Sequence, residues 1–517
     1  MSTRTYQDAI VHLNSLQSNA ATLEAVRASG GRLSEFAIPE MVEYLHRIGY
    51  EPEDLNKLNI LHITGTKGKG STCAFTDSIL RHVKPEWKIG LYTSPHLVAV
   101  RERIRINGVP LSESDFARFF FEVWDRLNEN DKRKFPSTPA KPMYFRYVTL
   151  VAFHAFLSLK ACSSSPLYAS LMVNATILEV GVGGAYDSTN IVPRPVVTGV
   201  SALGIDHTAV LGKTLKEIAW QKGGIYKEGV PAFTVIQPDE ALEVLKSQSK
   251  ERKASEFTVI PLKSEISGVK LGLAGEHQVQ NANLAVHLAQ KFLQIQDGTK
   301  PESPLSHLYI KALENAKWPG RCQTVMDPKH LDTTWFLDGA HTKESLECCV
   351  EWYVSPTAGL RPKPTARGRI RVLIFNCTNG RSGSSFLGTM LEKAGVQLKR
   401  HGSDEESSWL FDHVIFCANV TYADGGFKGD LTTNAIPEAD LAQLKTQQEL
   451  GIAWMSLVPS FPSKNIHVLP SIEHALRVVR SLTMEAQGPS AVDVLVTGSL
   501  HLVGGMIEVG DLTSVAL

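Results

Sequence analysis

The sequence predicts an α/β protein built on two successive sheets. Short apolar runs alternate with segments of helical periodicity, which is the pattern of strands joined by crossover helices. Strands that are joined in this way run parallel, so each sheet is expected to be mostly parallel. The chain has 517 residues, of which 43% are hydrophobic, and this suits roughly two to four packed domains of ordinary globular composition.

The expected strands fall into two series that are separated near residue 318. The first series reads NILHITG (59–65), KIGLYTS (88–94), ATILEVG (175–181), VVTGVSALGI (196–205) and PAFTVIQ (231–237). The second reads TWFLDGA (334–340), IRVLIFN (370–376), DHVIFCA (412–418), NIHVLP (465–470) and VDVLVTG (492–498). We therefore predict a larger α/β domain over residues 1–318 and a smaller α/β domain over residues 319–517.

The composition excludes several classes of partner. The 53 basic residues balance the 53 acidic residues, so no net charge draws the chain to nucleic acid or to an anionic membrane. No apolar run approaches the roughly eighteen residues of a membrane-spanning helix, and the first residues, MSTRTYQDAIVHLNSLQ, do not read as a signal peptide. The seven scattered cysteines lack the paired spacing of a zinc site and favour a reducing compartment. We expect a soluble cytoplasmic protein with no nucleic-acid partner and no integral membrane association.

The stretch ILHITGTKGKGST (60–72) runs a strand into a glycine-rich turn. It is a shortened variant of the phosphate-binding rule G-x-x-x-x-G-K-[ST], because two residues rather than four separate Gly65 from Gly68, and Gly70 precedes Ser71. Glycines allow backbone N–H groups to turn toward an anion, a helix expected to begin near Ser71 adds its positive N-terminal dipole, and Lys69 adds a formal charge. The stretch predicts a P-loop that holds nucleotide phosphates, and a glycine-rich turn with solvated lysines is the alternative.

Other strands of the first series end in polar side chains. Ser94 and His96 flank Pro95 in LYTSPH, Glu179 ends the run ATILE, and Asp206 and His207 follow the fourth strand. Ligands of open α/β sheets gather at the carboxyl ends of the strands. A carboxylate, an imidazole and a hydroxyl beside a triphosphate would suit Mg²⁺, which accepts few protein ligands. Taken singly, each side chain also has a structural explanation, as a surface strand end, a satisfied loop histidine or a turn residue.

Eight blocks, in order along the chain, carry a resemblance to a known family: GTKGKGS, YTSPHL, RERIRING, EVGVGGAYDSTN, GIDHTAVLG, IAWQKGGIYK, WPGR and LDGAH. They resemble the folylpolyglutamate synthases, a branch of the Mur ligase superfamily of ATP-dependent amide-forming ligases. The blocks run from about residue 60 to 345, and VTGSLHLVGG (496–505) continues the match weakly. The resemblance thus spans most of the chain and implies a P-loop-containing, mostly parallel sheet domain followed by the smaller Rossmann-like domain.

The activity that the resemblance implies is ATP-dependent addition of L-glutamate to the γ-carboxylate of tetrahydrofolate and its polyglutamates. The carboxylate would first take the terminal phosphoryl group of ATP, and the amine of glutamate would then attack the acyl phosphate, giving ADP and phosphate. The first domain would bind ATP and folate, and the second would act as the glutamate ligase domain. ATP and Mg²⁺ are the implied cofactors, with a monovalent cation such as K⁺ as a further activator. Reduced folates and L-glutamate are the expected partners of a monomeric enzyme.

The resemblance also assigns roles to individual residues. ATP contacts fall on Lys67, Gly68, Lys69, Gly70, Ser71, Asn281, Arg321 and Asp338. Magnesium contacts fall on Ser94, Glu179 and His207, with Ser71 as a second-choice ligand. Catalytic roles fall on Lys69, Lys222 and His341, and substrate contacts on Ser94, Pro95, His96 and Arg101.

Two of these assignments have ordinary alternatives. Lys222 matches a lysine that is often carbamylated in the superfamily, which would replace a cation by an anion able to bind a second magnesium. The alternative is a plain lysine on an amphipathic helix. Asn281 matches a position near the adenine, and an asparagine that caps or crosses a helix is an equally ordinary explanation.

The stretch RERIRINGVPLS (101–112) predicts a β-hairpin around an Asn-Gly turn. Its alternating arginines, Arg101, Arg103 and Arg105, would share one basic face, which we assign to the polyglutamate tail. A solvated hairpin edge that carries separate charges is the alternative.

Several other functions remain open. A bifunctional enzyme would also make dihydrofolate from dihydropteroate. A cell-wall Mur ligase would share the ATP chemistry but normally has a further N-terminal domain, and only about sixty residues precede the P-loop here. A non-enzymatic P-loop nucleotide switch would use the glycine loop and Glu179 but gives no reason for the WPGR and LDGAH blocks. A mitochondrial form from an alternative start is also open.

Overall fold

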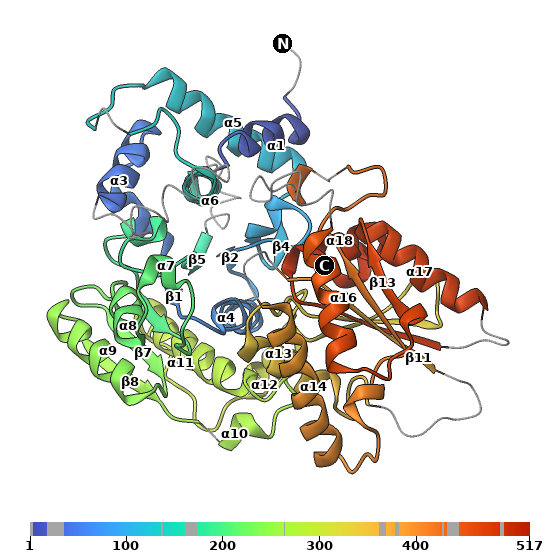
Figure 1. Cartoon of the computed structure of the whole chain (residues 1–517). Helices are drawn as coiled ribbons and strands as arrows, with labels where there is room; N and C mark the ends of the chain where they lie inside the picture. The colour runs from blue at the N-terminus through green and yellow to red at the C-terminus, as the bar shows by residue number, and fades with distance from the viewer. Residues whose placement is uncertain are drawn as a thin grey trace. The chain divides into compact units, whose positions relative to one another are not determined.

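The computed structural model describes residues 4–17, 36–135, 138–161, 173–262, 264–360, 369–377, 382–426, 429–431, 444–485 and 491–517 (Figure 1). The chain divides into two compact units. The first comprises Met1–His96, Val100–Gly272 and Gln278–Lys317, and the second comprises Leu97–Ala99, Leu273–His277 and Trp318–Leu517. The chain thus crosses between the units near residue 318 and also around two short segments that the strand pattern does not indicate.

The first unit contains an eight-stranded sheet in the order β4-β3-β2-β5-β1-β6-β7-β8. Its strands are β1 (Ile60–Thr64), β2 (Lys88–Tyr92), β3 (Ile104–Ile106), β4 (Val109–Pro110), β5 (Val173–Glu179), β6 (Val197–Val200), β7 (Pro231–Val235) and β8 (Glu256–Ile260). The strands from β2 to β8 in this order pair in parallel, and β3 and β4 add an antiparallel hairpin at one edge. Every residue of β1 is buried, as expected for a central strand of a parallel sheet with both faces covered.

Helices cover this sheet in separate layers. They are α1 (Tyr6–Asn14), α3 (Ala37–Arg47), α4 (Lys69–Val83), α5 (Glu113–Glu129), α6 (Tyr144–Ala161), α7 (Thr208–Leu211), α8 (Leu215–Gly223), α9 (Asp239–Glu251), α10 (Ser264–Ser267), α11 (Gln278–Asp297) and α12 (His307–Asn315). The P-loop helix α4 packs against α11 and α12, whereas α1, α3, α5 and α6 pack on one another at the top of Figure 1.

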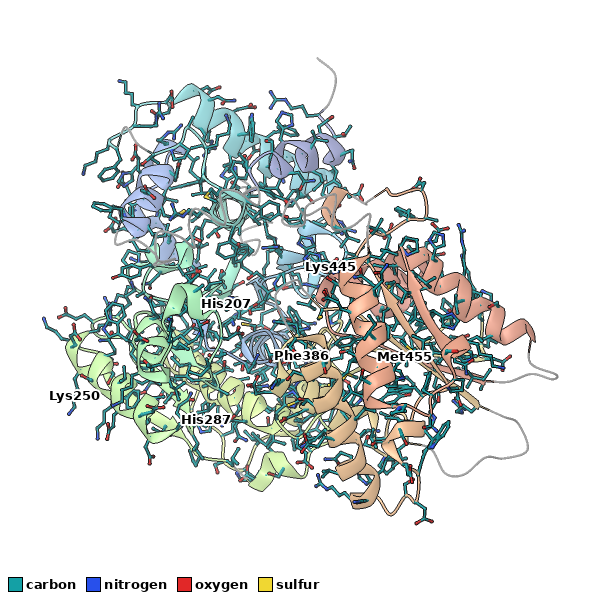
Figure 2. The ribbon with its side chains drawn as sticks, in the orientation of Figure 1. His207, Lys250, His287, Phe386, Lys445 and Met455 are labelled. Carbon is teal, nitrogen blue, oxygen red and sulfur yellow. The ribbon has the colours of Figure 1, made fainter. Side chains whose placement is uncertain are left out.

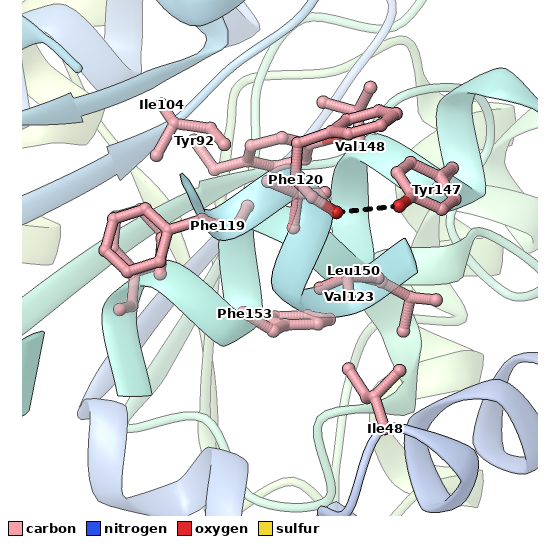
Figure 3. Close-up of a cluster of buried hydrophobic side chains, with 14 of the residues drawn as sticks. Ile48, Tyr92, Ile104, Phe119, Phe120, Val123, Tyr147, Val148, Leu150 and Phe153 are labelled. Atoms are coloured by element: carbon pink, nitrogen blue, oxygen red, sulfur yellow. Dashed lines mark hydrogen bonds between the residues drawn. The ribbon is translucent and has the colours of Figure 1, made fainter. Parts of the chain in front are cut away.

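An aromatic core joins α5 and α6 to the sheet (Figure 3). Phe119, Phe120 and Tyr147 are fully buried, and the Tyr147 hydroxyl donates to the Phe120 carbonyl oxygen at 2.9 Å. That bond allows a tyrosine to be buried without an unsatisfied polar group. Tyr92 of β2 and Ile104 of β3 belong to the same cluster. This layer therefore supports the edge of the sheet that carries the SPH loop, Ser94–His96.

The second unit contains a six-stranded sheet in the order β13-β12-β11-β14-β10-β9. Its strands are β9 (Gln323–Met326), β10 (Thr333–Leu337), β11 (Arg369–Phe375), β12 (His413–Cys417), β13 (Ile466–Leu469) and β14 (Ala491–Thr497). Only β9 is antiparallel to its neighbour in this described part of the sheet. The helices are α13 (Lys343–Tyr353), α14 (Gly383–Arg400), α16 (Lys445–Leu457), α17 (Ile472–Glu485), α18 (Leu500–Val509) and α19 (Thr513–Ala516).

Helices cover both faces of the second sheet. One buried core takes side chains from α13, α14 and α16, and another takes side chains from α17, α18 and α19. Leu373 and Phe375 of β11 enter the first core, and Val372 and Ile374 enter the second. Because successive side chains of a strand point to opposite faces, the two cores lie on opposite sides of the sheet.

The predicted fold class is confirmed: a P-loop on a mostly parallel sheet is followed by a smaller Rossmann-like α/β sheet. Each apolar run expected to be a strand contains one, although the run at 196–205 is a strand only as far as Val200. The sequence reasoning missed β8 and β9, whose runs EFTVI and QTVM are short and flanked by polar residues. No helix in the described ranges is both long enough and apolar enough to span a membrane.

Candidate active site

The P-loop is a tight turn between β1 and α4. Gly65 has a φ of +151°, and a Cβ atom on it would lie 1.9 Å from Ser201 Oγ, so only glycine fits. Ser201 follows β6, and its hydroxyl donates to the carbonyl oxygen of Lys67 at 2.7 Å. The loop is therefore fixed in shape from the neighbouring strand end.

The direction of the loop amides decides which of them can meet an anion. The N–H groups of Thr66 and Lys67 both donate to the carbonyl oxygen of Ala202 at 3.0 Å, so they are already used. The helix α4 begins at Lys69, earlier than expected, and follows Gly68, which is left-handed at φ +84° and provides no capping side chain. The first N–H groups of a helix have no partner inside it, and the dipole makes this end positive. The N-terminus of α4 is therefore the part of the loop suited to phosphate.

Asn281 of α11 lies directly against this turn. It is 2% exposed, and a Cβ atom on Gly68 would lie 2.0 Å from Asn281 Oδ1. Its amide donates to Gln278 Oε1 at 2.9 Å. The structure thus places the predicted nucleotide residue Asn281 beside the P-loop and inside the helix rather than at its cap.

Two lysines share one acceptor in the loop. Lys69 Nζ donates to the Gly65 carbonyl oxygen at 2.9 Å, and Lys222 Nζ donates to the same oxygen at 2.8 Å. Lys222 comes from α8 and is only 3% exposed, so it is a buried lysine and not a solvated one. Burial first, and then the positive charge of Lys69, lower the pKa of Lys222 well below its usual range. Burial thus favours the neutral, nucleophilic form of the Lys222 amine.

Glu179 and Ser94 meet at the same edge of the sheet. The strands β2, β5, β1 and β6 are neighbours in that order, so the residues that follow them lie side by side. Glu179 Oε2 accepts the N–H of Ser94 at 3.1 Å. Glu179 is 3% exposed, so the alternative of a surface strand end is wrong.

His207, labelled in Figure 2, is the N-cap residue of the short helix α7 and has a left-handed backbone at φ +49°. Its N–H donates to Asp206 Oδ1 at 2.8 Å, and Asp206 Oδ2 lies 3.6 Å from Lys67 Nζ. Loss of hydration lowers the pKa of His207. The charge of Asp206 raises it, and the charges of the nearby lysines, of which Lys69 has the largest effect, lower it again. The imidazole is thus kept neutral, with a lone pair available to a metal ion.

The donors at this edge fit Mg²⁺. In the part of the chain that the structure describes, no three His, Cys, Asp or Glu side chains form a ready metal cluster. Magnesium needs few protein ligands, because water and phosphate oxygens fill its other octahedral positions. A buried carboxylate (Glu179), a hydroxyl (Ser94) and a neutral imidazole (His207) provide such a partial set. Ser71, the second-choice ligand, is 7% exposed in the first turn of α4.

The hairpin after the SPH loop corrects one expectation. The turn at Asn107 and Gly108 is confirmed, but Arg101 and Arg103 precede the hairpin in a 3-10 helix, Val100–Arg103. Arg105 is buried, and its guanidinium donates to the carbonyl oxygens of Glu102 and Gly108. A single basic face is therefore wrong, because local acceptors draw the guanidinium groups into the fold.

The SPH loop itself is held by these arginines. Pro95 follows a cis peptide bond, and His96 Nδ1 accepts the Nε–H of Arg103 at 3.0 Å. Arg101 donates from Nη1 to the Leu111 carbonyl oxygen at 3.0 Å, while its Nε is buried with no hydrogen-bond partner in the described ranges.

In the second unit, Arg321, Asp338 and His341 gather at the end of β10. Asp338 is 5% exposed and accepts the N–H groups of Cys322 at 2.7 Å and Ala340 at 2.9 Å. Arg321 lies against this turn, since a Cβ atom on Gly339 would be 2.7 Å from its Nη1. His341 Nδ1 lies 3.0 Å from the Gly339 carbonyl oxygen. The fold thus brings these three predicted residues together.

Sequence reasoning missed several residues that shape the site. Ser201 fixes the P-loop, and Gln237, after β7, holds Ser201 by donating to its carbonyl oxygen at 2.9 Å. The rule that ligands gather at strand ends could have found both. In the second unit, His277 is within electrostatic reach of Asp338: loss of hydration lowers the pKa of His277, and Asp338 raises it.

Comparisons with known proteins identify the family. No family model matched the chain. A curated folylpolyglutamate synthase from Saccharomyces cerevisiae (strain FostersO) is 43% identical over 520 residues, which cover 98% of this chain and 87% of the relative. A Mycobacterium tuberculosis folylpolyglutamate synthase complexed with ADP and AMPPCP has a TM-score of 0.66 at 20% identity, covering 95% of this chain and 98% of that chain. An FPGS–AMPPCP–folate complex has a TM-score of 0.59 at 19% identity, covering 98% and 99% of the two chains. These two structures share the fold, and the identity with the yeast enzyme shows that the chain belongs to the folylpolyglutamate synthase family.

Proposed function

We propose that this chain is an ATP-dependent ligase that adds L-glutamate to the γ-carboxylate of tetrahydrofolate and its polyglutamates. The observation that carries the proposal is the 43% identity, along 98% of the chain, with a curated folylpolyglutamate synthase. The P-loop supports it, because the positive N-terminus of α4 and the side chain of Lys69 belong to the same turn. A cell-wall Mur ligase or a non-enzymatic switch has no comparable support.

In the first step, a γ-carboxylate oxygen attacks the terminal phosphorus of ATP, and ADP leaves. The N-terminal amides of α4 and Lys69 hold the phosphate oxygens and stabilise their charge. The ammonium group of Lys69 lies against the P-loop, where it donates to the carbonyl oxygens of Gly65 and Thr66 at 2.9 and 3.5 Å. We propose that phosphate oxygens replace these carbonyls when ATP binds.

Mg²⁺ would be held by Glu179, Ser94 and His207, and when bound it supplies positive charge to the phosphate oxygens. Glu179 contributes the anion, and its Ser94 N–H contact fixes one carboxylate oxygen. Asp206 holds the backbone of His207 and also pairs with Lys67, so it links the P-loop to the metal ligand.

In the second step, the amine of glutamate attacks the acyl carbon, the C–N bond forms, and phosphate leaves with the C–O bond electrons. The amine must lose a proton, and we propose His341 as the group that takes it. Arg321 is proposed to bind phosphate through its planar guanidinium, and Asp338 to fix the turn that carries both residues. His96, Pro95 and Arg101 are proposed to bind the folate.

The test is an assay of the purified chain with tetrahydrofolate, labelled glutamate and MgATP. We expect label to enter folate only when all three are present. A second arm replaces tetrahydrofolate by dihydropteroate, and we expect little incorporation there. Incorporation with both substrates would support the bifunctional alternative, and incorporation with neither would refute the ligase.

We also propose that Lys222 is carbamylated in the working enzyme. Its neutral amine attacks CO₂, a nitrogen–carbon bond forms, and one proton is released to water. The product is an anion, so the two lysine side chains that now donate to one carbonyl oxygen would no longer compete for it. We expect a carbamate signal in the carbon NMR spectrum with labelled bicarbonate, and its loss in Lys222→Ala. An unchanged spectrum in that variant would contradict the proposal.

Three points of the proposal concern conditions rather than residues. We propose a monomer, activation by a monovalent cation such as K⁺, and a cytoplasmic location, with a mitochondrial form from an alternative start. Sedimentation of the purified chain, replacement of K⁺ by a large organic cation in the assay, and imaging of tagged protein would test them.

A further inference from the structure

Three side chains beside the candidate site form a hydrogen-bonded chain that the proposed chemistry does not use. His62 lies in β1 and is 0% exposed. Its Nε2 lies 2.9 Å from Thr189 Oγ1, and Thr189 Oγ1 lies 2.7 Å from Asp187 Oδ1. All three residues are buried, so water cannot supply missing donors or acceptors. Each hydrogen bond between them must therefore have one donor and one acceptor.

The chemistry of the groups fixes the direction of the protons. An ionised carboxylate only accepts, so the Thr189 hydroxyl gives its single proton to Asp187. The hydroxyl oxygen must then accept from His62, which therefore carries its proton on Nε2. Nδ1 is left as a bare lone pair, buried and without a hydrogen-bond partner in the described chain.

Asp187 is the centre of a turn that follows Glu179. Besides the Thr189 hydroxyl, its carboxylate accepts the N–H groups of Thr189 and Val182 at 3.0 Å and that of Gly181. Burial raises the pKa of Asp187, and these hydrogen-bond donors act in the opposite direction, in favour of the ionised carboxylate. The turn that begins two residues after Glu179 is thus closed by Asp187.

The central strand anchors this turn at two points. His62 and Thr64 alternate along β1 and share one face. Thr64 Oγ1 donates to the Gly183 carbonyl oxygen at 2.7 Å, while His62 reaches Thr189. The segment between them cannot shift without breaking one of these bonds.

We propose that His62 is a positioning residue: through Thr189 and Asp187 it fixes the turn after Glu179 and so holds the Glu179 carboxylate in place for Mg²⁺. The inference rests on the proposed function. An apolar side chain would suit the rest of β1, whereas histidine leaves one buried nitrogen unsatisfied, which is a cost that calls for a role. Burial and then the charge of Lys227 hold the pKa of His62 down to about 3, so the neutral form persists across the working range.

Two matched pairs of variants test the role in the full-length chain. His62→Gln keeps a donor near Nε2, whereas His62→Leu removes it. Thr189→Ser keeps the hydroxyl, whereas Thr189→Val removes it and keeps the shape. The readout is the affinity for ADP measured by calorimetry, with Mg²⁺ and again with a chelator.

We expect the wild type to bind ADP more tightly with Mg²⁺. His62→Leu and Thr189→Val should each lose about ten-fold or more of that gain, as is usual when the support of a metal ligand is removed, with the chelated affinity within about two-fold of wild type. The Gln and Ser variants should keep most of the gain. Equal losses with and without Mg²⁺, or no loss in either Leu or Val variant, would overturn the proposal.

The proton direction has its own test. In protein labelled with ¹⁵N, the His62 imidazole, assigned by its absence in His62→Leu, should carry its proton on Nε2 and show a bare Nδ1. A proton on Nδ1 would overturn the hydrogen-bonded chain, whatever the enzyme binds. If the wild type shows no gain from Mg²⁺ while the proton is on Nε2, the proposed function has failed, and the positioning role fails with it.

Discussion

Glu179 at the end of β5 and Asp338 after β10 are both buried carboxylates at the carboxyl edge of a parallel sheet, but they have different partners. Both oxygens of Asp338 accept backbone N–H groups, from Cys322 and Ala340, and these bonds close the turn around it. Glu179 receives the N–H of Ser94 in a region that also gathers Lys69, Lys222 and His207. A carboxylate tied to its own turn has a structural task, whereas one among cationic and neutral ligand groups is suited to a metal ion or phosphate.

The largest expected effect is the fall in kcat when the positive charge of Lys69, in the first unit, is removed. Lys69→Met should lower kcat by about 100- to 1,000-fold, the usual result of removing a donor that stabilises the charge of a transition state. The melting temperature should change little, because Lys69 is only partly buried and its acceptors are loop carbonyls. Steady-state kinetics and thermal unfolding measure the two.

Lys253→Met is the matched control, since Lys253 is 70% exposed and pairs with Glu228. It should leave both quantities unchanged. Full activity of Lys69→Met would break the comparison, because the first unit would then hold no essential phosphate ligand at this loop.

A smaller effect is expected on the free energy of unfolding, which should fall more when Asp338 is replaced than when Glu179 is replaced. Asp338→Ala leaves two buried N–H groups without acceptors and should lower the free energy of unfolding by about 1–3 kcal/mol. Glu179→Gln keeps an acceptor oxygen and removes a buried charge, so it should change that energy by less than about 1 kcal/mol. Chemical denaturation measures both variants.

Asp338→Asn provides the control, because its amide oxygen can accept one of the two N–H groups. The free energy of unfolding that Asp338→Asn loses should lie between the losses of Asp338→Ala and Glu179→Gln. A larger loss in Glu179→Gln than in Asp338→Ala would reverse the assignment of structural and ligand roles.

The smallest effect concerns pH. The pKa of His62 is about 3 in the folded chain against an ordinary value of 6.5, so between these values the unfolded chain binds one more proton. Stability from this group is therefore complete above pH 6.5 and is lost as the pH falls, by about 1.4 kcal/mol per pH unit. His62→Leu should remove this part of the slope between pH 6.5 and 5, as measured by denaturation at each pH. An identical pH dependence in wild type and variant would show that His62 is accessible to protons in the folded state.

Particular elements show how far the sequence could predict the fold. The strands β1, β5 and β14 are mainly apolar runs bounded by glycine or polar residues, and such runs can be recognised without a structure. The strand β9 could not be found in this way, because its four residues alternate in exposure at a sheet edge. Its direction is set by pairing with β10, which is information that a local pattern does not contain.

The candidate site divides in the same manner. Lys69 and His207 follow predicted strands and Glu179 ends one, so the rule that ligands gather at strand ends predicts all three. His62 stands inside an apolar strand, and its partner Thr189 is 127 residues away, so only the register of β1 beside β5 reveals the contact. The basic face expected for the hairpin failed because a run of arginines does not disclose which carbonyl oxygens will lie near each guanidinium.

The segment Leu97–Ala99 limits where the chain can be divided into fragments. Leu97 and Val98 belong to a core of the second unit, and a side chain at Gly504 would collide with the Leu97 carbonyl oxygen at 1.9 Å. A fragment that starts at residue 318 would lack these two side chains and be left with a hole lined by Val503 and its neighbours. Truncation near residue 318 would thus leave the core of the second unit incompletely packed.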